Sequence, residues 1–205
     1  MSKTLFVPKV SGFDDLSAFA AAAVDIVDWP DEYPYKPEVN VRVAHDGTCI
    51  LLGFEVTEIN PRAVETISNG SVWEDSCVEF FVKECGSPYY YNFETNCIGT
   101  SLAAKRRSRE DFKHFDEAAI SRIIRRPSLG KEPVDISGPA SWHMEIEIPF
   151  DLFCGCGGVP ERLEANFYKC GDKTAEVHFL SWNPVVADAP DFHRPQDFGV
   201  LILEK

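Results

Sequence analysis

Residues 77–96, CVEFFVKECGSPYYYNFETN, contain the clearest fold signal in the chain. Successive side chains on a β-strand point to opposite faces of a sheet. Val78, Phe80 and Val82 therefore share one face of a strand, while Glu79 lies on the other. This alternation predicts a strand over residues 77–83 with an apolar face turned to a core.

The second half of the stretch separates apolar from polar side chains more sharply. A strand over residues 89–96 places Phe93 on one face, and Asn92, Glu94 and Asn96 on the other. The face opposite Phe93 therefore carries a wholly polar row of side chains. A strand with this pattern packs one face on a core and turns the other away from it.

Four polar side chains fall opposite the apolar rows in this way: Glu79, Asn92, Glu94 and Asn166. On an arbitrary β-sandwich such residues form a solvated face, and this is the first interpretation. The second is a sugar site, because carboxylates and amides bind hydroxyl groups while aromatic rings pack on the C–H face of a pyranose. The order of the strands decides whether the four share one face.

Alternation and turn signals predict the rest of the fold. Asp46-Gly47 is a strong signal for a hairpin between the first two expected strands. Eight strands with Gly and Pro turns predict an all-β fold, a jelly-roll-like antiparallel β-sandwich formed by one domain over residues 1–205. The strands are expected near residues 39–45, 48–57, 77–83, 89–96, 142–149, 163–170, 176–182 and 198–203.

Two segments fit this pattern less well. Residues 13–24 are rich in alanine and predict one minor helix near the N-terminus. Residues 101–130 are charged and irregular, and within them the segment AAISRIIRR (118–126) fits a helix or a strand. Both alternatives stay open.

The charge of the chain narrows the choice of partners. With 33 acidic and 20 basic residues, the formal net charge is −13. Such a surface repels phosphate groups, so neither nucleic acid nor an anionic membrane is expected as a partner. The start MSKTLFVPKV shows no signal peptide. A cytoplasmic location is therefore expected for the chain as it stands, and a periplasmic or extracellular one if an export signal was removed.

The cysteines predict reduced thiols, many of them small buried residues, because their number is odd and their spacing irregular. The seven are Cys49, Cys77, Cys85, Cys97, Cys154, Cys156 and Cys170. Cys154-Gly-Cys156 resembles a metal or redox pair, but no second pair follows it, so a structural role is preferred. No set of metal ligands is predicted.

Two aromatic residues lie in polar loops. Trp73 is in NGSVWEDS (69–76), and Phe192 is in ADAPDFHRPQDFG (187–199). Loop aromatics are harder to explain as core than strand aromatics, although many of them simply pin a loop to its domain. In the second loop, Arg194 either donates hydrogen bonds to a sugar or a carboxylate, or pairs with a nearby aspartate.

Four tracts together resemble carbohydrate-binding module family 9, and more closely its DOMON-related, stand-alone bacterial members. They are WEDSCVEFF (73–81), YYNFETN (90–96), SWNP (181–184) and DFHRPQDFGVLIL (191–203). The similarity extends from about Trp29 to the C-terminus. It implies a jelly-roll-like sandwich that binds a mono- or oligosaccharide between two tryptophans.

The resemblance also implies roles for individual residues. Trp73 matches the first clamp tryptophan, and Glu79 matches a carboxylate that contacts sugar hydroxyls. The second clamp tryptophan falls at Phe192, which offers a smaller stacking face. The sugar-contacting arginine falls at Glu94, which reverses the local charge. Some family members carry structural calcium, so calcium is a possible cofactor here, with no ligands assigned.

Three functions therefore remain in view. Non-catalytic sugar binding through Trp73, Glu79, Asn92, Glu94, Phe192 and Arg194 is preferred. A glycoside-processing enzyme would use Glu79 and Glu94 as its carboxylate pair. Further acid–base groups for such an enzyme would be Glu74, Asp75 and His193. An interaction domain with a decayed sugar site is the third alternative.

Overall fold

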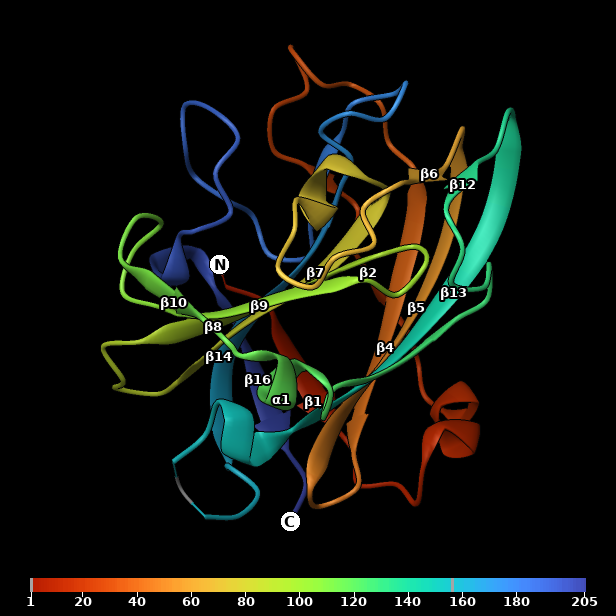
Figure 1. The fold of residues 1–205 in the computed structure, drawn as a ribbon. Coiled ribbons are helices and arrows are strands. Elements are labelled where there is room, and N and C mark those ends of the chain that lie inside the picture. The colour runs from red at the N-terminus through yellow and green to blue at the C-terminus, as the bar shows by residue number, and fades with distance from the viewer. Residues whose placement is uncertain (1, 156) are drawn as a thin grey trace.

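Two β-sheets face each other across an apolar core in the computed structural model, which describes residues 2–155 and 157–205 (Figure 1). Phe80 and Phe167 of the larger sheet and Phe54 of the smaller sheet belong to this core. The ring centroids of Phe54 and Phe167 lie 6.3 Å apart across it. The predicted all-β sandwich is confirmed.

The larger sheet contains nine strands among the described residues. Across the sheet they are β1 (Thr4–Val7), β16 (Gly199–Leu203), β14 (Arg162–Cys170), β7 (Cys77–Glu84), β8 (Tyr90–Asn96), β9 (Ser101–Arg106) and β10 (Phe112–His114), with β15 (Phe179–Ser181) on β14 and β3 (Ile26–Val27) on β15. β1 runs parallel to β16, whereas the other neighbours are antiparallel.

The smaller sheet covers one face of the larger. Its order is β11 (Ile124–Pro127), β13 (Pro139–Pro149), β5 (Cys49–Ile59), β4 (Glu38–His45) and β2 (Ala22–Ala23), and β12 (Val134–Asp135) pairs separately with β6 (Arg62–Ala63). The expected hairpin at Asp46-Gly47 joins β4 to β5, and Gly47 adopts the positive φ of 96° that favours glycine.

All eight predicted strands are present near their expected bounds, but the expected helix over residues 13–24 is wrong. A 3-10 helix covers only Phe13–Ala18, and the chain then forms β2, where Ala22 and Ala23 pair with β4. The strand-edge hydrogen bonds of β4 outweigh the helix propensity of alanine. The other 3-10 helices are Val72–Glu74, Phe150–Leu152 and Pro195–Asp197.

The segment 118–126 was expected to form a helix or a strand, and it contains part of each. A single helical turn, α1 (Glu117–Ile120), follows Asp116, whose side chain accepts a hydrogen bond from the Ala119 amide and so caps the helix. The strand β11 follows. Strand β9, which lies in the irregular region 101–130, was not predicted.

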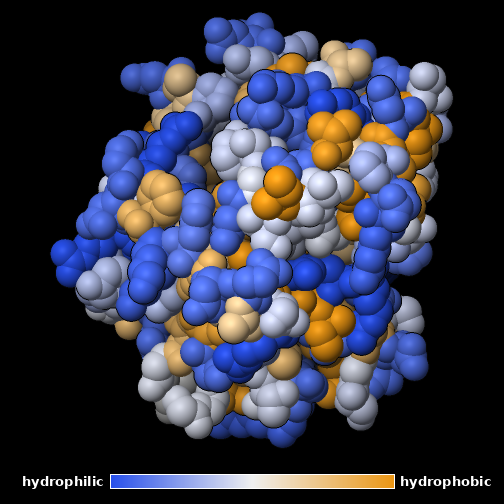
Figure 2. Space-filling model, viewed as in Figure 1, coloured by the Kyte–Doolittle hydropathy of each residue, from blue (hydrophilic) through white to orange (hydrophobic). Residues whose placement is uncertain are grey.

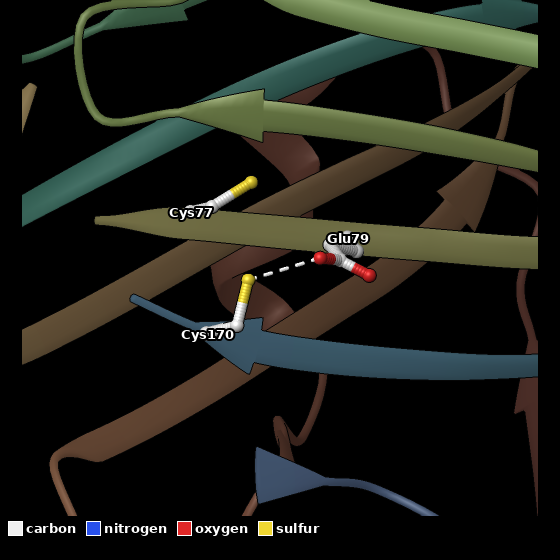
Figure 3. Close-up of side chains that lie close together, drawn as sticks. All are labelled: Cys77, Glu79 and Cys170. Atoms are coloured by element: carbon white, nitrogen blue, oxygen red, sulfur yellow. Dashed lines mark hydrogen bonds between the residues drawn. The ribbon is translucent and has the colours of Figure 1, made fainter. Parts of the chain in front are cut away.

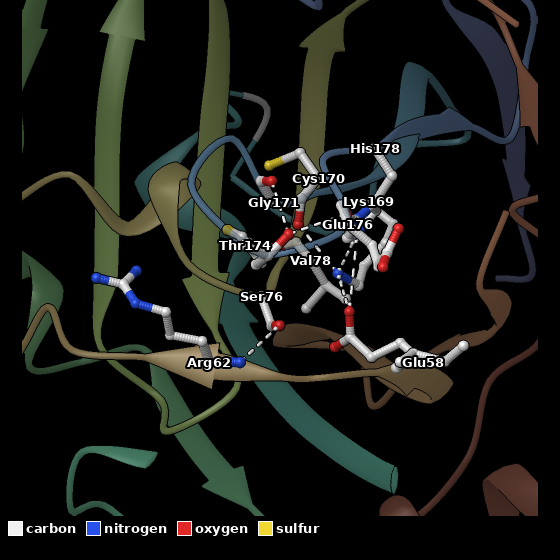
Figure 4. A network of polar contacts seen from close by, with 12 residues as sticks. Glu58, Arg62, Ser76, Val78, Lys169, Cys170, Gly171, Thr174, Glu176 and His178 are labelled. Carbon is white, nitrogen blue, oxygen red and sulfur yellow. Dashed lines mark hydrogen bonds and ion pairs between the residues drawn. The ribbon is translucent and has the colours of Figure 1, made fainter. Parts of the chain in front are cut away.

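A buried polar network links the two sheets (Figure 4). Lys169 of β14 lies 3.0 Å from a carboxylate oxygen of Glu58 on β5, and both side chains are inaccessible to solvent. Lys169 also donates to Nε2 of His178 at 2.6 Å. Burial, with the lysine charge, holds the pKa of His178 well below 6.5, so its ring is neutral and accepts this bond. Removing one partner would leave a buried charge uncompensated.

The surface is mostly polar on the face drawn in Figure 2, where hydrophobic residues form only small scattered groups. Scattered apolar residues are normal on protein surfaces. Within the described residues, no helix has both the length and the hydropathy needed to cross a membrane.

Candidate functional site

The outer face of the larger sheet carries a covered cavity. Its volume is about 320 Å³, and its floor includes side chains of β7, β8, β9 and β14. The solvated-face interpretation is therefore wrong. Glu79, Asn92, Glu94 and Asn166 are each at most 4 % exposed. Loops from four parts of the chain, including residues 190–193, cover the sheet at this point.

Two carboxylates lie side by side on the floor. Glu79 of β7 and Glu94 of β8 are direct cross-strand partners. Burial raises the pKa of Glu94 to about 7. Burial, followed by the charge of Glu94, raises the pKa of Glu79 well above its usual range. Near neutral pH the pair therefore retains protons, and it can both donate hydrogen bonds to hydroxyl groups and accept them.

A guanidinium reaches the same cavity from β9. Arg106 donates through Nε to Oδ1 of Asn92 at 2.6 Å, and Asn92 donates to Oε1 of Glu94 at 2.7 Å. A second bond from Arg106 goes to the backbone carbonyl of Arg109 at 2.8 Å. This chain of bonds holds the cation and one carboxylate in fixed positions, because each side chain is oriented by the next.

Aromatic side chains line the walls. Trp73 lies in the 3-10 helix Val72–Glu74 and is partly exposed, while Phe192 is almost completely buried. One face of the Phe192 ring stacks on Tyr168, with centroids 4.0 Å apart and an interplanar angle of 9°. Phe192 is therefore held in place by the domain, and the rings of Trp73 and Phe192 both line the cavity.

Ionisable groups complete the rim. Nδ1 of His193 lies 3.1 Å from the hydroxyl oxygen of Tyr90. Burial and the two nearby arginines lower the pKa of His193 to about 3, so its ring is neutral at physiological pH. Nη1 of Arg109 lies 3.6 Å from Oδ1 of Asp191, and this ion pair links two of the covering loops.

The structure brings together four of the six residues expected to bind a ligand: Trp73, Glu79, Glu94 and Phe192 line one cavity. Asn92 does not line it, and instead donates a hydrogen bond to Glu94 from the same face of β8. Arg194 does not line it either. Its Nε donates to Asp197 at 2.9 Å, which is the aspartate pairing considered from the sequence.

Arg106 was not predicted from the sequence as a site residue, although its side chain lines the cavity. The resemblance placed the family arginine at Glu94, on the neighbouring strand. In SLAAKR (101–106) small and apolar side chains occur on both faces, so the alternation that reveals a half-buried strand is weak. The position of Arg106 follows only from the register with β8 in the structure, where Tyr90 pairs with Arg106.

Among the described residues, one group of side chains is close enough to hold a metal ion: Cys77, Glu79 and Cys170. Two thiols do not suit calcium, which prefers oxygen ligands, so the expected calcium remains a prediction without assigned ligands. No disulfide joins the cysteines that the structure describes. The Cys154–Cys156 pair cannot be placed, because Cys156 lies outside the described residues.

Comparison with known proteins identifies the family. A candidate carbohydrate-binding protein from Bacteroides uniformis is 39% identical, with all of both chains covered and a TM-score of 0.93. A family 9 module from Caldicellulosiruptor kristjanssonii, solved with glucose, is 13% identical over 98% of this chain and 96% of that one, with a TM-score of 0.60. Its structure with cellotriose gives 12% identity, coverage of 98% and 94%, and a TM-score of 0.57.

These two more distant structures support the fold alone. Among curated proteins, none matches the sequence. The model of carbohydrate-binding family 9 matches residues 10–203, which is nearly the whole chain. The chain belongs to carbohydrate-binding family 9.

Proposed function

We propose that this protein binds a carbohydrate, without cleaving it, in the cavity above β7, β8 and β14. The observation that carries the proposal is the adjacent placement of Glu79 and Glu94 on the cavity floor, with Arg106 beside them and aromatic rings on the walls. Family membership supports binding as the function.

The chemistry of the cavity suits a sugar. Partly protonated carboxyl groups donate and accept hydrogen bonds, and Arg106 supplies further donors, so vicinal hydroxyls meet both kinds of partner. The indole of Trp73 offers an apolar surface for the C–H face of the ring. A cavity of about 320 Å³ lies at the lower end of the range for small-molecule sites, which favours a monosaccharide or the end of an oligosaccharide.

The carboxylate pair by itself does not favour catalysis. In the described structure Glu94 is held by Asn92, and Glu79 by the thiol of Cys170 at 3.0 Å. Asp75, considered from the sequence as an acid–base group, is buried 2.9 Å from Arg62 and accepts backbone hydrogen bonds from residues 64 and 65. Asp75 therefore has a structural role that explains its burial.

Calorimetric titration with glucose, cellotriose and a panel of other mono- and oligosaccharides tests the proposal. We expect one site per chain with a dissociation constant on the order of micromolar to millimolar, because every polar contact replaces one with water. Glu79→Ala should weaken binding at least about tenfold, a loss of about 1.4 kcal/mol. Glu164→Ala, on the same sheet but paired with Lys83 away from the cavity, is the matched control and should bind normally.

Two results would contradict the proposal. One is the absence of heat and of any competing signal with every sugar in the panel. The other is steady release of reducing ends from an oligosaccharide, abolished by Glu79→Ala, which would show hydrolysis.

A further inference from the structure

Three side chains of types that can bind a metal ion lie close together, and two of them, Glu79 and Cys170, line the cavity. Cys77 of β7 and Cys170 of β14 are direct cross-strand partners. Glu79 lies two residues along β7 from Cys77 and so projects from the same face. In Figure 3 both sulfur atoms and the Glu79 carboxylate lie together over these two strands. Their ligand atoms all lie within 4.8 Å of one another.

These side chains are buried, and the hydrogen bonds between them are weak. Cys77, Glu79 and Cys170 are each at most 3 % exposed. In the part of the chain that the structure describes, the Glu79 carboxylate has the Cys170 thiol as its hydrogen-bond donor, with Sγ 3.0 Å from Oε1. A thiol is a weak donor. A metal ion would be a stronger partner for this carboxylate, which lies beside a second carboxyl group on Glu94.

The donor set selects the kind of ion. Two sulfurs and one carboxylate oxygen suit zinc, whereas calcium and magnesium prefer all-oxygen sites. Zinc–sulfur bonds of ~2.3 Å and zinc–oxygen bonds of ~2.1 Å in a tetrahedron place the ligand atoms roughly 3.5–3.8 Å apart. Small side-chain rotations bring atoms that already lie within 4.8 Å of one another to this spacing.

We propose that Cys77, Glu79 and Cys170 bind one zinc ion, with the fourth coordination position open to the cavity. Glu79 and Cys170 both line the cavity, so a water molecule or a ligand oxygen can reach that position. Three protein ligands with one open position are the usual arrangement of a zinc ion that contacts a ligand, unlike the closed four-ligand arrangement of a structural zinc.

Cobalt(II) replaces zinc as a spectroscopic probe in the test. The full chain, kept reduced, is titrated with Co²⁺ in the absence of sugar, so that the outcome does not depend on carbohydrate binding. We expect thiolate-to-cobalt charge-transfer absorption and the visible bands of a tetrahedral ion, saturating at one ion per chain. One equivalent of Zn²⁺ should abolish both.

Variants locate the ion. Cys77→Ser and Cys170→Ser should each weaken Co²⁺ binding at least tenfold. Cys85→Ser removes an exposed thiol and is the matched control, which should bind as the unmodified chain does. Circular dichroism and melting curves check that each variant folds. If a serine variant does not fold, the alanine variant at the same position, Cys77→Ala or Cys170→Ala, replaces it, because alanine is small and apolar.

The proposal is overturned if the reduced chain shows no thiolate-to-cobalt absorption. It is also overturned if the absorption persists unchanged in the folded Cys77 and Cys170 variants, since the ion would then lie elsewhere. Carbohydrate binding that persists in either case would leave the proposed function intact.

Discussion

Strand β7 buries both of its faces, but the two faces are chemically different. On one face Phe80 is 1 % exposed and stacks on Phe167, with ring centroids 5.4 Å apart. On the other, Glu79 is 3 % exposed and faces Glu94. Burial of Phe80 stabilises the fold through removal of apolar surface from water. Burial of two carboxyl groups costs stability, because it separates them from water while they repel each other.

The comparison shows that equal burial does not imply an equal role. The core face is closed by the second sheet, which packs side chain against side chain. The other face is closed only by loops, which leave a cavity above polar groups. A costly arrangement of this kind is typical of binding sites. If the core face provides stability and the cavity face provides binding, a substitution on one face should change mainly the property that belongs to it.

The largest effect is expected on the core face. Phe80→Ala should lower the free energy of unfolding by about 3–5 kcal/mol, since it removes a fully packed ring and leaves a void between the sheets. Urea denaturation measures this. Phe6→Ala on β1, at a residue that is 58 % exposed, is the control and should change stability by less than about 1 kcal/mol. Similar losses in both variants would contradict the assignment of the core.

The next effect is expected on the cavity face. Trp73→Ala should weaken sugar binding by about 1–3 kcal/mol, roughly five- to 150-fold, because the stacking surface is lost. The melting temperature of Trp73→Ala should fall much less than that of Phe80→Ala, since Trp73 is only partly buried, against a smaller apolar cluster. Trp142→Phe is the converse control. Trp142 is buried and donates to Glu58 at 2.7 Å, so this variant should lose stability and retain affinity.

A pH-dependent effect of intermediate size is expected from His193. Its folded-state pKa, about 3, lies below the usual 6.5, so between these values the unfolded chain binds a proton there that the folded chain does not. Stability contributed by this group is therefore lost as pH falls below 6.5.

Between pH 6.5 and 4.5 the loss should be about 1–2 kcal/mol, and His193→Asn should not show it. Urea midpoints at the two pH values measure the difference. His143→Asn alters an exposed histidine on β13 and should follow the unmodified chain. An unchanged pH dependence in His193→Asn would show that His193 is not buried as a neutral ring.

The smallest effect is expected at Arg194. Because this side chain pairs with Asp197 and does not line the cavity, Arg194→Ala should leave sugar affinity within about twofold and reduce stability by at most about 1 kcal/mol. Calorimetry and melting curves measure both. A tenfold loss of affinity in the folded variant would show that Arg194 reaches the ligand after all.

Alternation along the strands predicted the division between the faces, but not what covers the second face. Placing Glu79 and Glu94 opposite the apolar rows follows directly from a period of two. Their pairing across β7 and β8, and their enclosure by loops, depend on contacts far apart in sequence, which no local period encodes. Arg106 was missed for the same reason, since only the register of β9 reveals which way it points.

The parallel pairing of β1 with β16 has a mechanical consequence. The N-terminal end of β1 and the C-terminal end of β16 lie at opposite ends of one strand pair, so tension applied through those ends slides the strands past each other. Flanking bonds, from the Val200 amide to Lys3 and from the Glu204 amide to Val7, are loaded together with the bonds inside the pair. A pair sheared in this way must break its bonds at nearly the same moment, and so resists extension better than a hairpin that unzips one bond at a time.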